Sequence, residues 1–361
     1  MELHPEASLG IDLLNDIGVN QAVVISPLSI LLSLSLVHFG AKGHTKEQIK
    51  DVIVNGSTHE NLIEHFSHLQ KLIGNEVNDV KTSIANRIFL AKDIEINETY
   101  LTGINDHYKA SAQNINFDDT QNAAKIINDY ISENTMKKIT NMIGADSLKG
   151  VDAVLINAIY FQADWRDKYA LGSAKNQDFH TSATEKRTIP FLKNHGVFRK
   201  YAEDEYFRVL SIPYKDKSAS FLIFLPKTRF GLMKSLNNFN GERFHKLFEN
   251  LTSEYVKTAF PKFKITKAWN LNDALSKKGL RELFTESADL SGIGHNVKIS
   301  SISHSAMIEV DEWGTRAAAA TEVKFYTTSA ISGEPINFVA DEPFLFAVVK
   351  ESTPLFMGIF A

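Results

Sequence analysis

Cysteine is absent from this chain of 361 residues. Without a thiol the protein cannot form a disulfide, a thiolate nucleophile, a zinc finger or an iron–sulfur cluster. An excess of positive charge is missing too, because 39 Lys and Arg stand against 43 Asp and Glu, for a formal net charge of −4. Proteins that bind phosphate backbones are usually basic over at least one domain, so we expect no nucleic-acid partner.

Long apolar runs are also missing. The most apolar stretch, residues 25–39, is 15 residues long and contains four serines, so it predicts a buried helix and not a membrane span. The N-terminus carries acidic and proline residues where a signal peptide needs a basic start and an apolar run. We therefore expect a cytoplasmic monomer without a membrane partner, with secretion left open if a leader has been removed.

The chain shows helical patterns first and strand patterns later. Apolar residues recur three or four positions apart, as in amphipathic helices, at residues 45–54, 60–73 and 120–133. Runs that are apolar or alternate between apolar and polar residues predict strands at residues 154–161, 220–225, 255–265, 297–310 and 344–349. One more helix is predicted at residues 271–283. This order indicates an α+β fold. No linker or repeat divides the chain, so we predict one domain spanning residues 1–361.

The common catalytic motifs are not present. The sequence contains no G-x-S-x-G, Walker loop, G-x-G-x-x-G or H-E-x-x-H. His65 and His68 have the spacing of two metal ligands on a helix, but no further ligands accompany them, so we interpret them as a helix face. We predict that the protein is not an enzyme, has no catalytic residue and needs neither a metal nor a cofactor.

Residues 312–329 do not have the composition of a normal loop. Alternate positions from Thr315 to Phe325 carry no charge, whereas Arg316, Glu322 and Lys324 occupy the intervening positions. Because side chains of a strand point alternately to opposite faces, this segment could lie in a sheet with one face buried. The same pattern also fits an ordinary surface strand or a short Ala-rich helix.

The stretch 308–321 resembles the hinge of the reactive-centre loop in inhibitory serpins. Other stretches resemble motifs of the same family and occur in family order: Ser26-Pro27-Leu28-Ser29-Ile30, Asn157 to Phe161 followed by Trp165, Phe260-Pro261-Lys262-Phe263, Ala288-Asp289-Leu290-Ser291-Gly292 and Pro354-Leu355-Phe356-Met357-Gly358. Each motif is weak alone. Their joint occurrence from Ser26 to Gly358 identifies the chain as a member of the serpin family, of the intracellular ovalbumin-like type.

The resemblance implies a serpin fold with about three β-sheets, eight or nine helices and an exposed reactive-centre loop at about residues 312–335. In such inhibitors a protease cleaves the loop, an acyl-enzyme forms, and the cleaved loop inserts into the central sheet as a new strand. Insertion carries the protease tens of ångströms and distorts its catalytic geometry. Small Ala and Thr side chains suit such an insertion because they make few clashes between existing strands.

The resemblance also assigns residues. The hinge comprises Glu312, Gly314, Thr315, Arg316, Ala317, Ala318, Ala319, Ala320 and Thr321. A sheet-opening cluster comprises Ser26, Ser29, Asn157, Trp165 and His304. Counting fourteen residues on from Gly314 predicts the reactive bond between Thr328 and Ser329, with Phe325, Tyr326 and Thr327 as alternatives. Three departures stand out. Arg316 replaces the usual glutamate, and Trp313 replaces a smaller or charged residue. The stretch from Thr328 to Pro343 is also a few residues longer than in typical members, which is why alternatives to the bond after Thr328 are kept.

The position of the bond decides the expected target. Cleavage after Thr328 indicates an elastase-like serine protease, and cleavage after Phe325 or Tyr326 a chymotrypsin-like one or a cysteine cathepsin. Lys324 would suit a trypsin-like protease but leaves a short insertable arm. The alternative function is a non-inhibitory serpin that acts as a chaperone, carrier or storage protein. The four consecutive alanines favour inhibition over this alternative, because non-inhibitory relatives tend to have bulky, charged or proline-containing hinges.

Overall fold

The computed structural model describes residues 5–54, 62, 65–66, 69, 81–315 and 334–361. Eight α-helices, two short 3₁₀-helices and fifteen strands occur in these residues. The strands pair into two sheets. The α+β class predicted from the order of helical and strand patterns is therefore confirmed, and the predicted helix at 60–73 lies largely outside the described residues.

The six-stranded sheet has the order β10-β11-β12-β4-β2-β3. Its strands are β10 (Phe263–Asn270), β11 (Ile299–Val310), β12 (Gly314–Thr315), β4 (Ala153–Asp164), β2 (Lys81–Ala91) and β3 (Ser111–Ile115). The two long central strands, β11 and β4, run parallel. Each is also antiparallel to its other long neighbour, β10 for β11 and β2 for β4.

The second sheet has nine strands and the order β1-β15-β14-β8-β7-β6-β9-β13, with β5 paired to β6 beside this path. Its strands are β1 (Val23–Ile25), β5 (Lys175–His180), β6 (Lys186–Glu203), β7 (Phe207–Pro213), β8 (Ala219–Pro226), β9 (Thr252–Pro261), β13 (Ile336–Val339), β14 (Phe344–Lys350) and β15 (Thr353–Phe360). The expectation of about three sheets thus becomes two in the described residues. The reason is β6, whose 18 residues pair in turn with β5, β9 and β7 and so join two groups of strands into one sheet.

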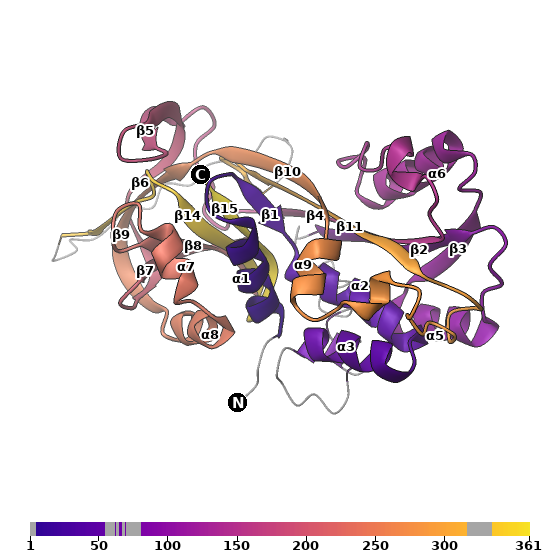
Figure 1. Ribbon diagram of the computed structural model, residues 1–361. Helices are drawn as coiled ribbons and strands as arrows, with labels where there is room; N and C mark the ends of the chain where they lie inside the picture. The colour runs from indigo at the N-terminus through magenta and orange to yellow at the C-terminus, as the bar shows by residue number, and fades with distance from the viewer. Residues whose placement is uncertain (1–4, 55–61, 63–64, 67–68, 70–80, 316–333) are drawn as a thin grey trace.

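The helices cover the sheets from several sides. They are α1 (Pro5–Ile17), α2 (Pro27–Gly40), α3 (Gly43–Val54), α5 (Glu98–Tyr108), α6 (Thr120–Asn134), α7 (Leu232–Asn237), α8 (Gly241–Glu249) and α9 (Asn272–Lys277). In Figure 1, α6 lies on one face of the six-stranded sheet, and α2, α3 and α5 lie on the other. None of the helices in the described part of the chain has the length and apolar content needed to cross a membrane.

Strand β4 is buried on both faces because the sheet lies between these helices. Val154 and Ile156 belong to a core cluster that includes residues of α6, whereas Leu155 and Ile159 belong to the larger core on the side of α2. A strand covered on both faces reads as a continuous apolar run, which is why residues 154–161 could be predicted from sequence. Asn157 is the exception in this run, and it is fully buried.

Local signals explain where α2 begins. Ser26 caps the helix, since its Oγ accepts a hydrogen bond from the Ser29 amide at 3.2 Å, and Pro27 occupies the first turn, where no amide hydrogen is needed. In two places the strand and helix predictions ran too far. The predicted strand at 255–265 is split at Lys262 into β9 and β10, and the predicted helix at 271–283 ends after α9, with Gly279 at φ +107° before a 3₁₀ turn.

Candidate functional site

The candidate site is the place where β11 and β4 separate. Below it the two strands are paired directly, from Ile299 with Ala153 up to Met307 with Tyr160. Above it the short strand β12 fills the gap, and Thr315 pairs with Val310 of β11 on one side and Ala163 of β4 on the other. The first residues of the predicted loop are therefore already in the central sheet.

Thr315 is fully buried in this gap. Its hydroxyl lies 2.7 Å from the Tyr214 hydroxyl, within hydrogen-bond distance. The Tyr214 ring stacks on Trp165 at 4.8 Å between centroids, and burial raises the pKa of Tyr214. The stacked rings hold the Tyr214 hydroxyl in place, and the Tyr214 hydroxyl in turn fixes the position of the Thr315 side chain.

Gly314 is required at its position by space and by backbone conformation. Its φ is +154°, and a Cβ atom at this residue would lie 2.0 Å from the Ala163 carbonyl oxygen. No side chain fits at that distance, because the obstacle is the backbone of β4. Gly314 thus permits the close approach of β12 to β4.

The turn between β11 and β12 is held by a buried carboxylate. Asp311 Oδ1 accepts hydrogen bonds from the amides of Trp313 at 2.8 Å and Gly314 at 3.2 Å. Burial raises the pKa of Asp311, and the two amide bonds partly offset this effect. Glu312 is 6% exposed and its carboxylate lies 2.8 Å from the Lys262 ammonium. These residues of the predicted exposed loop are therefore buried, which corrects the expectation that the loop is exposed from Glu312 onward.

The residues that follow β4 bind three successive carbonyl groups of this turn. The Trp165 side chain donates to Asp311 O at 2.8 Å, the Tyr169 amide to Glu312 O at 2.9 Å, and the Trp165 amide to Trp313 O at 2.7 Å. Sequence alone assigned Trp165 to the sheet-opening cluster. The structure places it at the turn of the hinge.

A second polar group lies deeper, between the sheet and α2. His304 of β11 and Asn157 of β4 are paired across the two parallel strands, and His304 Nδ1 hydrogen-bonds Asn157 Oδ1. The Ser29 hydroxyl of α2 donates to the same oxygen at 2.8 Å, and the Asn157 amide donates to Ser29 O at 3.0 Å. The Ser26 hydroxyl donates to Leu355 O at 2.6 Å. The structure thus brings together Ser26, Ser29, Asn157 and His304.

The ionisation state of His304 follows from these contacts. Its Nε2 accepts a hydrogen bond from the Ser26 amide at 3.0 Å, so the proton is on Nδ1, which donates to Asn157. The residue is fully buried, and burial lowers the pKa of His304 to about 3. The imidazole is therefore neutral and serves as a hydrogen-bond bridge between α2 and the two strands β4 and β11.

Sequence reasoning missed three members of these groups. Asn86 of β2 accepts from the Asn157 amide and, at 3.1 Å, from the Ser33 hydroxyl, so the cluster extends across three strands. Ser33 could have been found, since it follows Ser29 by one helical turn. Asn86 and Tyr214 have no sequence signal of this kind. Only the strand register and the packing bring them here.

Several predicted residues fall outside the described part of the chain. They are Arg316, Ala317, Ala318, Ala319, Ala320, Thr321, Phe325, Tyr326, Thr327, Thr328 and Ser329. His68 is outside it as well, and His65 lies 2.9 Å from the Glu6 carboxylate. Within the described ranges, no group of three or more His, Asp or Glu side chains is arranged to hold a metal ion.

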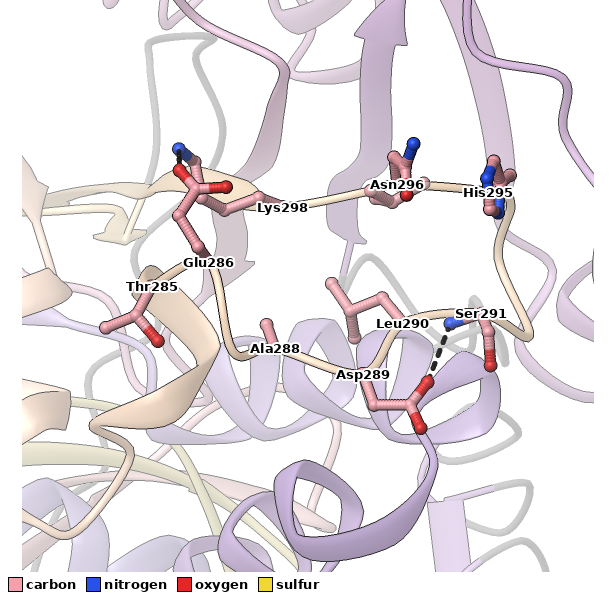
Figure 2. A pocket seen from close by; sticks show the side chains of 10 residues that line it. Thr285, Glu286, Ala288, Asp289, Leu290, Ser291, His295, Asn296 and Lys298 are labelled. Carbon is pink, nitrogen blue, oxygen red and sulfur yellow. Dashed lines mark hydrogen bonds and ion pairs between the residues drawn. The ribbon is translucent and has the colours of Figure 1, made fainter.

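The Ala288–Gly292 motif fixes a turn at the lower end of β11. Ala288, Asp289, Leu290 and Ser291 line one side of a pocket of about 300 Å³ (Figure 2). Hydrogen bonds from Ser291 lower the pKa of Asp289. Gly292 contacts the backbone of α2 so closely that a Cβ there would lie 2.5 Å from the Gly40 carbonyl oxygen. The motif thus packs this turn on α2, away from the hinge.

The central sheet is parted between β11 and β4, and the short strand β12 is buried in the gap. Comparison with known proteins identifies the class of protein to which this arrangement belongs. A model of the family described as "Serpin (serine protease inhibitor)" matches residues 5–361. The plasma serine protease inhibitor of Bos taurus is 33% identical over 348 residues, which cover 94% of this chain and 84% of that protein. Human Serpin B4 is 30% identical over 364 residues, covering 94% and 93%.

Solved structures show the same fold. The crystal structure of Serpin48 from the insect Tenebrio molitor superposes with a TM-score of 0.86 at 28% identity and covers 98% of this chain and 94% of that one. The chain therefore belongs to the serpin family, whose inhibitors are not enzymes. The serpin fold expected from the sequence motifs is confirmed.

Proposed function

We propose that the chain is a suicide-substrate inhibitor of serine proteases. The observation that carries this proposal is the position of Thr315, buried between β11 and β4 at the start of the predicted loop. In the proposed reaction the protease serine attacks the carbonyl carbon of Thr328. The amide bond to Ser329 breaks, the new amine takes up the proton, and an ester joins the protease to Thr328.

The register of β12 supports insertion of the loop along the gap. Six residues beyond Thr315, Thr321 would reach Asn157 of β4, six before Ala163, and His304 of β11, six before Val310. Ten residues beyond Thr315, Phe325 would reach Ala153, the first residue of β4. The sheet thus has room for residues 315–325, and a bond after Thr328 leaves a short connection to the protease.

The side chains of the loop suit the two faces of the gap. Thr315 points to Tyr214 on the side of the larger core. Alternate residues from Thr315 through Thr321 would face the same side, and all of them are Thr or Ala. Arg316, at the first intervening position, would point to the opposite face, so burial of its charge against α2 is avoided.

The proposed target is an elastase-like protease, because Thr328 presents a small side chain to the primary pocket. A bond after Phe325 or Tyr326 would instead suit a chymotrypsin-like protease, and cross-class inhibition of cysteine cathepsins belongs to the same proposal. The test is to mix the protein with elastase, chymotrypsin, trypsin and a cathepsin and to separate the products by denaturing electrophoresis. A band near the summed masses that survives detergent supports the proposal, and the mass of the released C-terminal peptide locates the bond.

Cleavage by every protease without a covalent complex contradicts the proposal if cleavage also leaves heat stability unchanged. An inhibitory serpin gains stability when the cleaved loop becomes a strand, whatever the target. If the stability rises without a complex, the panel lacked the right protease and should be extended.

The second candidate function is that of a carrier, and one cavity favours it. A hollow of about 530 Å³ lies beside the end of α8 and is lined by Phe198, Phe248 and Leu251 together with Lys200 and Lys217, and four serines and Glu351 also line it. Apolar walls with nearby cations suit an amphipathic carboxylate. Fluorescence titration with 1-anilinonaphthalene-8-sulfonate, followed by displacement with aromatic carboxylates, tests this candidate independently of protease inhibition.

We also propose a cytoplasmic monomer of the ovalbumin-like type, with a single domain and with neither nucleic-acid nor membrane partners. The lack of cysteine suits a reducing compartment, and the net charge of −4 does not favour phosphate backbones. Cell fractionation and size-exclusion chromatography test the location and the oligomeric state.

A further inference from the structure

Trp313 occupies the turn between β11 and β12, directly before the hinge glycine. Its side chain is almost completely covered, since the residue is 7% exposed. The Lys168 ammonium lies 4.9 Å from the centroid of the indole ring, within the range of a cation–π interaction. The same ammonium is 2.7 Å from the Asp164 carboxylate. Trp313, Lys168 and Asp164 therefore form one connected group, which we call the hinge clamp.

The hinge clamp joins the turn to β4 at the first pair of the inserted strand. Asp164 is the residue of β4 that pairs with Gly314. The backbone of Trp313 is held on both sides, because its amide donates to Asp311 Oδ1 at 2.8 Å and its carbonyl accepts from the Trp165 amide at 2.7 Å. The ring and the backbone of Trp313 thus fix the same short segment, Gly314–Thr315, between the two strands.

We propose that Trp313, held by Lys168, is the positioning residue that keeps Thr315 in the gap so that loop insertion starts in register. This inference rests on the proposed inhibitory function. After acylation, insertion competes with hydrolysis of the ester by water, and the faster process decides the outcome. Ordering the first residues of a new strand costs conformational entropy. In this protein that cost is met before cleavage, because Thr315 is already paired with Val310 and Ala163.

The first test measures how cleaved molecules divide between the covalent complex and the hydrolysed product. Trp313→Ala removes the ring, so we expect the number of inhibitor molecules consumed per protease trapped to rise about fivefold. Trp313→Phe keeps a ring under Lys168 and should stay within about twofold of the wild type. The rate at which the protease attacks the loop should not change, because Trp313 is 15 positions before Thr328, the residue at the predicted reactive bond. If Trp313→Ala caused only a general loss of packing, it would lower heat stability but leave the ratio of covalent complex to hydrolysed product unchanged.

Lysine variants separate the clamp from ordinary ion pairing. Lys168→Gln removes the cation above the ring and should raise consumption by a smaller factor than Trp313→Ala. The matched control is Lys278→Gln. Lys278 is 3.0 Å from the Asp12 carboxylate and joins α9 to α1, away from the hinge, so its loss should leave the partition unchanged.

The second test needs no protease. A synthetic peptide of residues 315–328 competes with the hinge for the gap, and its insertion is followed as a gain in heat stability. The intact clamp should slow this insertion, so the peptide should enter Trp313→Ala several-fold faster than the wild type, with Lys168→Gln between them and Lys278→Gln like the wild type.

The two tests together give a decision in every case. An unchanged partition for Trp313→Ala overturns the inference. If the wild type forms no complex with any protease and cleavage leaves its heat stability unchanged, the inhibitory function fails, and the peptide test decides for the clamp alone. Faster insertion of the peptide into Trp313→Ala then supports the clamp, and equal rates overturn it.

Discussion

Acidification should destabilise this protein through His304. Burial lowers the pKa of His304 to about 3 in the folded protein, whereas an unfolded chain has the ordinary value of 6.5. Between these values the unfolded state takes up a proton that the folded state does not bind. The contribution of His304 to stability is therefore complete above pH 6.5 and is lost as the pH falls toward 3. At pH 5 the loss relative to pH 7.5 amounts to about 2 kcal/mol.

The variant His304→Gln isolates this effect. A glutamine oxygen can accept the hydrogen bond of the Ser26 amide and its nitrogen can donate to Asn157, as the neutral imidazole does. We expect the variant to be less stable than the wild type at pH 7.5 by roughly 1 to 2 kcal/mol, because its packing in the buried site is imperfect. At pH 5 the difference should shrink by about 2 kcal/mol, since glutamine does not titrate.

The assay is urea unfolding followed by tryptophan fluorescence at pH 7.5 and pH 5, with equal m-values required for the comparison. His195→Gln is the matched control, because His195 is an exposed histidine on β6. A difference between wild type and His304→Gln that is equal at both pH values would refute the reasoning. It would mean that His304 binds its proton as readily in the folded protein as in the unfolded chain.

Three further predictions concern the hinge and the cluster below it. Gly314→Ala should displace β12 from the sheet and lower the free energy of unfolding by roughly 1 to 3 kcal/mol, because the new Cβ would lie 2.0 Å from the Ala163 carbonyl oxygen. Hydrogen exchange at the amides of the turn should become faster, and an unchanged exchange rate would contradict the prediction. Asn157→Ala removes a hydrogen-bond partner from buried groups on α2, β11 and β2, so the free energy of urea unfolding should fall by roughly 2 to 4 kcal/mol. A loss below that range would show that water replaces the amide. Lys262→Gln removes a half-exposed partner of the buried Glu312 carboxylate and should cost up to about 1 kcal/mol at low salt; a double-mutant cycle with Glu312→Gln checks whether the coupling weakens as salt is added.

The hinge and the polar cluster act on the same two strands at different depths. At the top, β12 already separates β11 from β4, whereas Asn157 and His304 connect the strands below through a direct hydrogen bond. If insertion proceeds as proposed, this hydrogen bond must break when Thr321 of the inserting loop comes to lie between Asn157 and His304. A threonine hydroxyl can both donate and accept, so Thr321 is suited to replace the bond that it interrupts.

The long buried elements and the family could be predicted from the amino-acid sequence. Residues 154–161 and 344–349 could be predicted as strands because a strand buried on both faces must be apolar at nearly every position. The serine-containing apolar run at 25–39 could be predicted as a helix, and α2 (Pro27–Gly40) covers the run from residue 27 to its end. Motifs such as the one around Asn157 also identified residues that would meet, since each motif keeps its polar residue for a packing reason.

The way in which these elements combine depends on long-range packing that no local sequence pattern encodes. The number of sheets depends on how far β6 extends through its pairings, and no local pattern encodes this. Asn86 and Tyr214 join the site through strand register and ring packing, and the residues that they hydrogen-bond there, Asn157 and Thr315, are more than 50 positions away in the chain. The burial of Glu312, Gly314 and Thr315 depends on whether two parallel strands are parted at one end. That is a balance of pairing energies across the whole sheet, and the alternating pattern of the hinge permits either outcome.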